Sequence, residues 1–376
     1  MRFPPLVAPV LALSASERSR TARHTSLAAL GEIGQRRLAG AHVAIVGAGG
    51  LGSPAILALA AAGVGTLTVI DDDVVELSNL QRQVLHRLSD VGEAKTASAV
   101  RAVAALSPET TVRTVRERLG PANATDLLAG AHLVLDGSDT FATREAVAAA
   151  TEGLGIPLVW GAIQSFDAQV TVFWSAPPGG SPVLLRDLYP IGSADDAPTC
   201  EEVGVLGALC LQVGSLMATE AVKLITGIGE PLFGRVLVID ALAARQSEVP
   251  LRGSAAGTDA AHPPAPPVSR PAAPPAISVA ETARRIDEGA RVIDVREPAE
   301  LADGTIDGAV SLPLAELLAD PGRAAPGPLI VVCAIGVRAE RAAAALRASG
   351  VEATVLDGGM RAWQAAGAPV VHAVRA

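Results

Sequence analysis

The chain has 376 residues, enough for two domains that each bury their own core. Hydrophobic residues make up 49% of it but aromatic residues only 2%, so the cores must consist of Ala, Val and Leu, which is typical of alternating strands and helices. The net charge of -9 argues against nucleic acid as the main partner, because phosphate contacts need clustered Lys and Arg.

The three cysteines, Cys200, Cys210 and Cys333, are widely spaced and odd in number, so they imply no disulfide framework. The chain has no Cys-x-x-Cys pair, and structural zinc normally needs four Cys or His ligands at close pairwise spacing. We therefore expect no zinc. This cysteine usage favours a reducing, cytoplasmic setting.

Two apolar stretches resemble membrane segments. Residues 3–13 follow Arg2 as in a signal peptide, but prolines interrupt them, and we predict a poorly ordered tail over residues 1–19. Residues 43–70 carry no charge, but they contain glycines and a proline and change from strand-like to helix-like patterning midway. The second stretch therefore predicts a strand–helix–strand unit, and we expect no membrane association.

That unit begins with a strand, a glycine turn and a helix. The apolar run Val43–Val46 is typical of a buried parallel strand, and Gly47, Gly49 and Gly52 follow it in G-x-G-x-x-G spacing, with Gly50 between. Glycines let the backbone turn tightly and approach a polyphosphate, while the free N–H groups at the start of the next helix favour anionic oxygen. The pattern predicts a phosphate-binding turn.

A second apolar run, Leu67–Ile70, ends in Asp71, where a Rossmann-type fold places an acid on the ribose hydroxyls. The glycine motif alone would equally suit a nicotinamide-dependent enzyme. The residues after it favour ATP, because cations, an amide and a hydroxyl suit the charge that develops when a triphosphate is attacked at its α-phosphorus. The expected nucleotide contacts here are Asp73, Ser78, Asn79, Leu80, Gln81, Arg82 and Lys95.

The order G-x-G-G-L-G, D-D-D, S-N-L-Q-R-Q and K closely resembles the adenylating enzymes of the ubiquitin-activating superfamily, of the ThiF/MoeB type that activates small sulfur-carrier proteins. The resemblance implies a Rossmann-like α/β adenylation domain with a mostly parallel sheet, which we place at residues 20–252. It also implies a homodimer in which an arginine near the N-terminus enters the partner's nucleotide site. That role falls on Arg23, although the family tyrosine beside it is Thr21 here.

Strands and helices continue to alternate through this domain. Helical spacing covers 93–106 and 122–128, with Asn123 as a cap, and further strands are predicted at 112–115, 133–136, 158–162, 168–174 and 235–239, with an edge strand at 246–251.

Asp136 and Asp139 follow one of these strands, so they lie at the carboxyl edge of a parallel sheet, where ligands of open α/β folds bind. The default role of Asp139 is a helix cap. The resemblance, to a D-x-x-D-N motif, implies instead that Asp139 is a ligand of Mg²⁺ and nucleotide. The Asn of that motif is Thr140 here, which we retain as a nucleotide contact.

Residues 175–198 are rich in Pro and Gly. Many family members have zinc-binding cysteine pairs before such a segment and near the end of the domain; without them, the resemblance is to the zinc-free branch, with Leu185 in place of a tyrosine. Cys200 comes directly before a long predicted helix, whose N-terminus favours a thiolate, and its position resembles the reactive cysteine of the family. Cys210, within that helix, is expected in the core.

Residues 253–276 are rich in Pro and Ala and predict an extended linker, whose reach at about 3.1 Å per residue is roughly 70 to 80 Å. Residues 277–376 resume the alternation of strands and helices and predict a second, smaller α/β domain. Within it, the apolar strand Leu329–Val332 ends in Cys333, and a short loop containing Arg338 opens an Ala-rich helix.

The loop N–H groups, the helix dipole and Arg338 suit a thiolate or persulfide anion on Cys333. Together with the D-V-R-E-P and I-x-G-A elements, this C-x-x-G-x-R loop resembles a rhodanese domain with a six-residue active loop, which implies that Cys333 carries a persulfide. Phosphate-cleaving cysteine enzymes use similar loops, usually with one more residue, and a buried unreactive thiol is the remaining alternative.

The two resemblances imply one joined reaction. The substrate is a ubiquitin-like sulfur carrier ending in Gly-Gly, whose carboxylate attacks ATP to give an acyl-adenylate. The persulfide of Cys333, charged by thiosulfate or a cysteine desulfurase, displaces AMP, and Cys200 then frees a thiocarboxylate.

Three alternatives remain open from the sequence. They are a nicotinamide oxidoreductase, adenylation alone with sulfur from elsewhere, and a carrier-binding scaffold without catalysis. The scaffold is suggested by departures from the family pattern at Thr21, Thr140, Leu185 and Val203.

Overall fold

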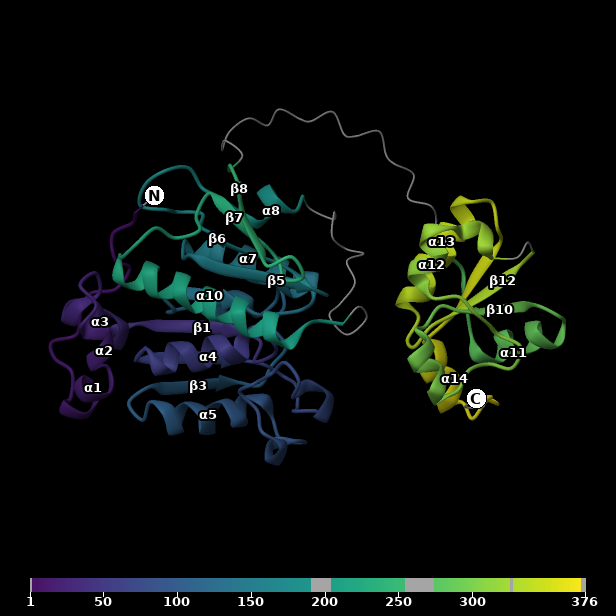
Figure 1. Cartoon of the computed structure of the whole chain (residues 1–376), viewed down its shortest axis with the longest axis horizontal. Helices are drawn as coiled ribbons and strands as arrows, with labels where there is room; N and C mark the ends of the chain where they lie inside the picture. Colours follow the sequence, from purple (N-terminus) through teal and green to yellow (C-terminus); the bar gives the residue numbers. More distant parts are fainter. Residues whose placement is uncertain (1, 191–203, 254–273, 325–326, 373–376) are drawn as a thin grey trace. The chain divides into compact units, whose positions relative to one another are not determined.

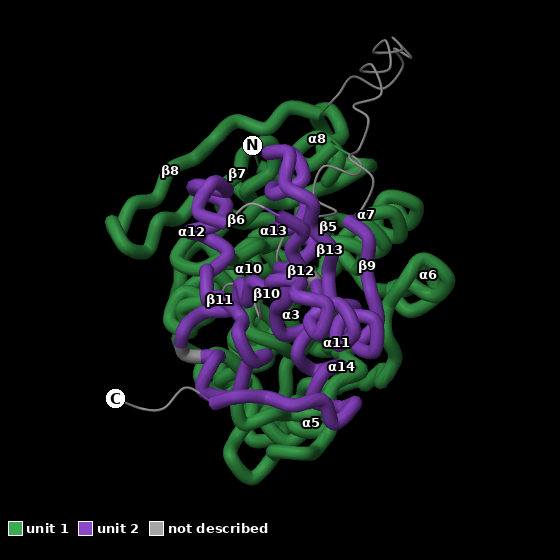
Figure 2. The backbone as a smooth tube through the Cα atoms, turned by 90° about the vertical axis from the view of Figure 1, so that its right-hand side faces the viewer, with its two compact units in different colours: residues 1–257 green, residues 258–376 purple. Residues whose placement is uncertain are grey.

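The computed structural model describes residues 2–190, 204–253, 274–324 and 327–372. The chain divides into two compact units, Met1–Gly257 and Thr258–Ala376 (Figures 1 and 2). The first has an eight-stranded sheet in the order β3-β2-β1-β4-β5-β6-β7-β8, and the second a five-stranded sheet in the order β11-β10-β12-β13-β9. The predicted fold class, a mostly parallel α/β unit followed by a smaller α/β unit, is confirmed.

The strands of the first unit from β3 to β5 run parallel, and β6 to β8 continue the sheet antiparallel. Val46, the last residue of β1, pairs with both Ile70 of β2 and Asp136 of β4. The segments that follow these three strands therefore leave the sheet at one edge. The strands are β1 His42–Val46, β2 Thr66–Ile70, β3 Thr111–Val115, β4 Leu133–Asp136, β5 Leu158–Gln164, β6 Asp167–Phe173, β7 Arg235–Asp240 and β8 Arg245–Pro250.

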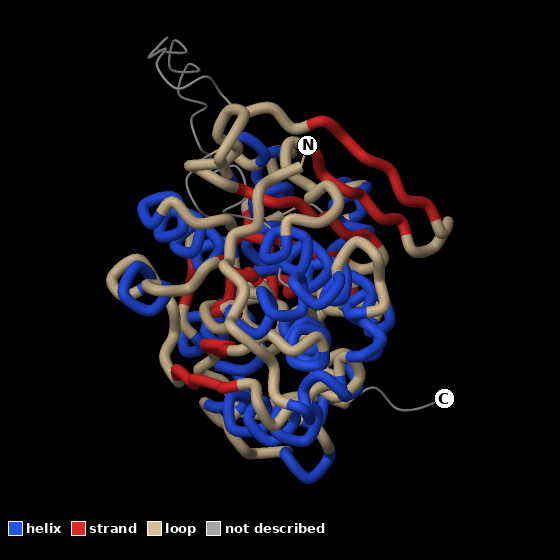
Figure 3. The backbone as a smooth tube through the Cα atoms, turned by 90° about the vertical axis from the view of Figure 1, so that its left-hand side faces the viewer, coloured by secondary structure: helices blue, strands red, loops and turns tan. Residues whose placement is uncertain are grey.

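Helices cover both faces of this sheet (Figure 3). Because side chains alternate along a strand, Val43 and Ile45 of β1 pack in one core with α4 and α10, while Ala44 and Val46 pack in another with α6 and α7. The helices are α1 Ala15–Arg20, α2 Ala22–Thr25, α3 Gly31–Gly40, α4 Gly52–Ala61, α5 Lys95–Leu106, α6 Ala124–Leu128, α7 Phe141–Leu154, α8 Leu185–Leu188 and α10 Gly207–Thr226, with 3₁₀ turns η1 Leu77–Asn79 and η2 Leu88–Asp90.

One helix among the described residues, α10, is long and apolar enough to cross a membrane by length and composition. Its side chains Leu209, Val213 and Met217 are buried in the same core as α4. Helix α10 thus serves as a core helix of the first unit.

The predicted disorder of residues 1–19 is wrong for residues 2–19. The Phe3 ring packs edge-on against Trp174 and Phe233, with centroids 5.3 and 5.2 Å away, and the N–H of Leu6 donates to the carbonyl of Leu224. Phe3 and Val7 are buried. The sequence shows an apolar run interrupted by prolines, but it does not show that Phe3 packs against Trp174 and Phe233.

Replacing Phe3 by alanine should therefore destabilise the first unit by about 3 kcal/mol, since a buried aromatic ring leaves a cavity. The expected fall in the unfolding midpoint is roughly 6 to 12 °C. Phe166, 41% exposed, is the matched control, and Phe166→Ala should shift the midpoint far less in the same thermal scan. Equal shifts for the two variants would mean that the N-terminal segment contributes no packing.

All strand pairs of the second unit are parallel, and helices cover both faces of its sheet. Its first strand includes Ala276, so the predicted linker extends one residue too far. The elements are β9 Ala276–Ile277, α11 Val279–Asp287, β10 Arg291–Asp294, η3 Pro298–Asp303, β11 Val310–Ser311, α12 Leu314–Ala319, η4 Pro321–Arg323, β12 Leu329–Val332, α13 Val337–Ala348, β13 Ala353–Leu356 and α14 Gly359–Ala365.

Candidate active site

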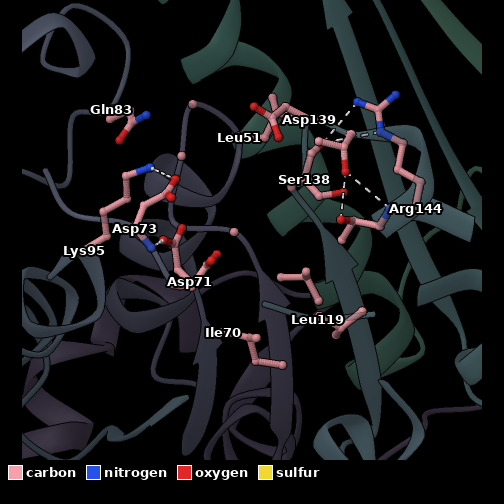
Figure 4. A pocket seen from close by; sticks show the side chains of 18 of the residues that line it. Leu51, Ile70, Asp71, Asp73, Gln83, Lys95, Leu119, Ser138, Asp139 and Arg144 are labelled. Carbon is pink, nitrogen blue, oxygen red and sulfur yellow. Dashed lines mark hydrogen bonds and ion pairs between the residues drawn. The ribbon is translucent and has the colours of Figure 1, made fainter. Parts of the chain in front are cut away.

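An open pocket lies at the carboxyl edge of the first sheet, beyond β1, β2 and β4 (Figure 4). It encloses about 1070 Å³, part of it open to solvent. The structure brings together here nine residues predicted to bind nucleotide: Gly47, Gly49, Gly50, Asp71, Asp73, Arg82, Lys95, Asp139 and Thr140.

The glycine turn forms one wall of the pocket. Gly47 has a φ of +87°, which favours glycine, and a Cβ on Gly52 would lie 1.8 Å from the carbonyl oxygen of Gly47. The absence of a side chain at Gly52 thus allows the first turn of α4 to pack against the glycine turn. Gly52 itself does not line the pocket. A Cβ on Gly50 would lie 3.1 Å from the Sγ of Cys210. Cys210 is buried, as predicted, and it also lines the pocket.

Asp71 is held in the position predicted for the ribose acid. Its Oδ2 accepts a hydrogen bond from the Ala48 N–H at 2.7 Å, and its Oδ1 accepts one from the Asp73 N–H at 2.9 Å. Burial raises the pKa of Asp71, while the nearby positive charge of Lys95 acts to lower it. The carboxylate retains lone pairs for the hydroxyl groups of a ligand.

Lys95 is the buried cation of the pocket. It is the first residue of α5, its side chain is 8% exposed, and its Nζ lies 2.8 Å from Oδ2 of Asp73, which is 57% exposed (Figure 4). The ion pair fixes the ammonium group at the pocket wall. Because Asp73 reaches solvent, the charge of Lys95 is only partly compensated.

Arg82 reaches the pocket from the turn that contains η1. Its Nη1 donates to the carbonyl of Ser78 at 3.3 Å, and the buried Asn79 side chain accepts from the Glu76 N–H at 3.2 Å. A Cβ on Gly207 would lie 2.1 Å from the carbonyl oxygen of Gln81, so this turn packs closely on the start of α10. Ser78, Asn79, Leu80 and Gln81 are not among the residues that line the pocket, and nucleotide contacts from them stay a prediction.

Asp139 is not the cap of α7. Thr140 occupies that position, its Oγ1 accepting a hydrogen bond from the Thr143 N–H at 3.3 Å, and exposed Asp139 lines the pocket. Asp136, in contrast, is fully buried in β4, where its Oδ1 accepts from the N–H and Oγ of Ser138 and burial raises its pKa. Of the two acids, only Asp139 is available to a ligand.

No group of three or more His, Cys, Asp or Glu side chains among the described residues could hold a metal ion. Mg²⁺ is commonly held by one or two carboxylates together with substrate phosphates and water. Asp139 on the pocket wall fits that arrangement, provided that a nucleotide supplies the remaining oxygens.

Arg144 and Gln83 are two of the pocket residues that were not among the predicted contacts. Arg144 donates from Nε and Nη2 to the carbonyl of Ser138, at 3.3 and 3.0 Å, and lies 5.6 Å from the ring centroid of Trp160 (Figure 4). Gln83 is buried and its Oε1 has no partner. Its place next to Arg82 in the S-N-L-Q-R-Q motif was a usable signal, whereas the position of Arg144 depends on how α7 packs.

Arg23 and Cys200 complete the predicted site residues of the first unit. Arg23 is exposed on α2 and is not among the residues that line the pocket of its own chain. Cys200 lies outside the described residues, as does Val203.

The second candidate site is the loop between β12 and α13. Cys333 directly follows the strand and is buried, and its Sγ accepts a hydrogen bond from the Gly336 N–H at 3.1 Å. A Cβ on Gly359 would lie 2.4 Å from the carbonyl oxygen of Cys333, and the N–H of Met360 donates to that oxygen at 2.8 Å. The start of α14 therefore packs directly on this loop.

Arg338 is fixed, as predicted, but by a carboxylate that sequence reasoning missed. Its Nη1 and Nη2 each donate to Glu300 at 2.7 Å, and these bonds from Arg338 lower the pKa of Glu300. The pair compensates much of the positive charge expected beside Cys333. The N–H of Gly336 is thus the clearest anion-stabilising group at the sulfur.

Residues 21–258 match the ThiF family, and residues 278–366 match the rhodanese-like domain. The chain is 42% identical to the probable adenylyltransferase/sulfurtransferase MoeZ of Mycobacterium tuberculosis, over 96% of each chain. It is 45% identical to the sulfur carrier protein adenylyltransferase of Thermus thermophilus, over 63% of this chain and 88% of that protein. The structure of Escherichia coli MccB with ATP is similar in fold, with 21% identity, a TM-score of 0.55, and coverage of 65% of this chain and 74% of that one.

Proposed function

Because the chain belongs to the ThiF family and continues into a rhodanese-like domain, we propose that it activates the Gly-Gly terminus of a ubiquitin-like sulfur carrier with ATP and then sulfurates it. The observation that carries this proposal is the similarity to an adenylyltransferase/sulfurtransferase over 96% of both chains. The pocket and the Cys333 loop supply the chemistry that each half needs.

In the first step, the carrier carboxylate attacks the α-phosphorus of ATP, pyrophosphate leaves, and an acyl-adenylate forms. Asp71 accepts hydrogen bonds from the ribose hydroxyls, and Arg82 and Lys95 stabilise the charge that develops on the phosphates. Asp139 would hold Mg²⁺, which neutralises part of the triphosphate charge when it is bound.

In the second step, the outer sulfur of a persulfide on Cys333 attacks the acyl carbon, and AMP leaves with the electron pair of the C–O bond. The carrier is then joined to Cys333 through an acyl-persulfide. The thiolate of Cys200 attacks the Sγ of Cys333, the bond between the two persulfide sulfurs breaks, and its electron pair leaves on the carrier thiocarboxylate. Two equivalents of an external thiol reduce the resulting disulfide and are themselves joined in a disulfide.

The partners follow from the same proposal. Two copies of the chain form a homodimer, and Arg23, exposed on α2, enters the nucleotide site of the second copy. Thiosulfate or a cysteine desulfurase charges Cys333. The enzyme works in the cytoplasm and without zinc.

A second candidate, adenylation with sulfur from another protein, has one observation in its favour. Cys333 is buried, and the cation beside it is paired with Glu300. Sulfur transfer by Cys333 therefore requires that the outer persulfide sulfur be accessible to the acyl-adenylate.

The test is to incubate the purified full chain with candidate Gly-Gly carriers, ATP and a sulfur donor, and to weigh the carrier by mass spectrometry. We expect one carrier to gain one sulfur in place of one oxygen, and only when ATP is present. An unchanged mass for every candidate carrier, with each donor, would contradict the proposed function.

A further inference from the structure

His86 lies behind the glycine turn, outside the residues that line the pocket. It is buried, its Nε2 lies 3.0 Å from the carbonyl oxygen of Ala48, and its Nδ1 lies 3.0 Å from Oγ of Ser98. Nothing in the proposed reaction uses this side chain. A buried imidazole that contacts the phosphate-binding turn therefore needs a role of its own.

Ala48 is held from both sides by side chains. Its N–H donates to Oδ2 of Asp71 at 2.7 Å, and its carbonyl oxygen accepts from the Oγ of Ser53 at 2.9 Å as well as facing His86. Its neighbours are Gly47 and Gly49, which restrict the backbone least. The orientation of the two peptide groups that flank the Cα of Ala48 therefore depends on the side chains that hold them.

The geometry assigns the proton on His86. A carbonyl oxygen can only accept, so Nε2 must carry a hydrogen to bond to Ala48. Nδ1 then accepts from the Ser98 hydroxyl in the neutral ring, and donates to that oxygen when the ring is protonated. The single hydroxyl hydrogen of Ser98 points to Nδ1 in the neutral ring and to Oδ2 of Asp90, 2.8 Å away, in the protonated ring, so the bond from Nε2 to Ala48 fits both protonation states.

The burial of the ring favours its neutral form near pH 7. Burial lowers the pKa of His86, Lys95 adds to this, and the Ala48 and Asp90 interactions oppose it. Asp90 stays ionised because hydrogen bonds from Arg101 and from the Arg87 N–H outweigh its burial and lower its pKa.

We propose that His86 is a positioning residue, whose Nε2–H holds the Ala48 peptide so that the glycine turn presents its N–H groups to the phosphates of ATP. The inference rests on the proposed binding of ATP in this pocket. It adds that the Nε2–H tautomer of His86, which does not line the pocket, preorganises the glycine turn through a hydrogen bond to Ala48.

Replacing His86 by glutamine or by asparagine distinguishes a hydrogen-bond donor at the position of Nε2 from one at the position of Nδ1. His86→Gln carries an N–H at about the distance of Nε2, and His86→Asn carries one at about the distance of Nδ1. We expect His86→Asn to raise KM for ATP in pyrophosphate exchange about tenfold, the effect of one lost hydrogen bond, with kcat nearly unchanged. His86→Gln should restore KM to within threefold of the wild type.

Nitrogen NMR of the full chain, labelled at histidine, gives a readout that needs no ATP. The expected result at pH 8 is a neutral ring protonated at Nε2 and not at Nδ1. A hydrogen on Nδ1 instead, or equal KM values for the Gln and Asn variants, would overturn the inference. Failure of the wild type to bind ATP in calorimetry would instead sink the proposed function, while the tautomer measurement would still stand.

Discussion

Cys333→Ala is expected to abolish thiocarboxylate formation on the carrier and to leave ATP–pyrophosphate exchange unchanged. The sulfur atom that accepts the Gly-Gly acyl group is carried by Cys333, whereas the exchange reaction needs only the carrier carboxylate and the pocket of the first unit. Carrier mass and exchange rate are to be measured on the same preparation. Ser349→Ala, at the exposed end of α13, is the control and should retain both activities.

A carrier that still gains sulfur with Cys333→Ala would show that the sulfur comes from another protein. The chain would then be an adenylating enzyme alone. If Cys333→Ala lost both pyrophosphate exchange and sulfur transfer, the two units would depend on each other for the first chemical step.

Lys95→Met should lower the rate of ATP–pyrophosphate exchange at least about 100-fold, the effect expected from removing one preorganised group that stabilises transition-state charge. The methionine roughly preserves the length of the side chain but removes the ammonium group from the pocket wall. Its partner, Asp73, is 57% exposed, so water can solvate the carboxylate that remains. The loss should therefore reflect catalysis more than folding.

The chain has one other lysine, Lys223, which serves as the control, although its carboxylate partner is 3% exposed and exchange is therefore to be compared per folded protein. Lys223 also pairs with a carboxylate, Glu220, at 2.5 Å, but it lies near the end of α10 and does not line the pocket. Lys223→Met should keep exchange within threefold of the wild type. If both lysine variants lose exchange equally, the effect is one of stability and Lys95 has no special role.

Much of the pocket could be predicted because its signals are local. The run Val43–Val46, the glycine spacing and the run that ends at Asp71 each define one element, and parallel strands bring their carboxyl ends to one edge. The same logic placed Asp139 there, because it follows β4. The ThiF and rhodanese-like matches agree with the motifs that identified each domain.

The residues that were missed depend on packing between distant segments. Arg144 reaches the pocket only because α7 lies against β4 and β5, and Glu300 meets Arg338 across 38 positions of sequence. The ring of Phe3 contacts Trp174 and Phe233 only in the folded chain, because these residues are far apart in the sequence. Residue spacing shows which groups are present, but not which of them the tertiary structure pairs.

The same limit applies to Asp139, for which the sequence offered two roles. Thr140 caps α7, so the carboxylate of Asp139 is not used as the cap. The structure thus excludes Asp139 as the cap of α7, and ligand binding in the pocket remains its predicted role.

The most direct test of the account is pyrophosphate release by Asp139→Ala in the presence of ATP and a Gly-Gly carrier. If the pocket holds a triphosphate for attack by a protein carboxylate, release should fall at least about 100-fold while the fold is retained. Unchanged release by this variant would contradict the assignment of the pocket and the reaction built on it.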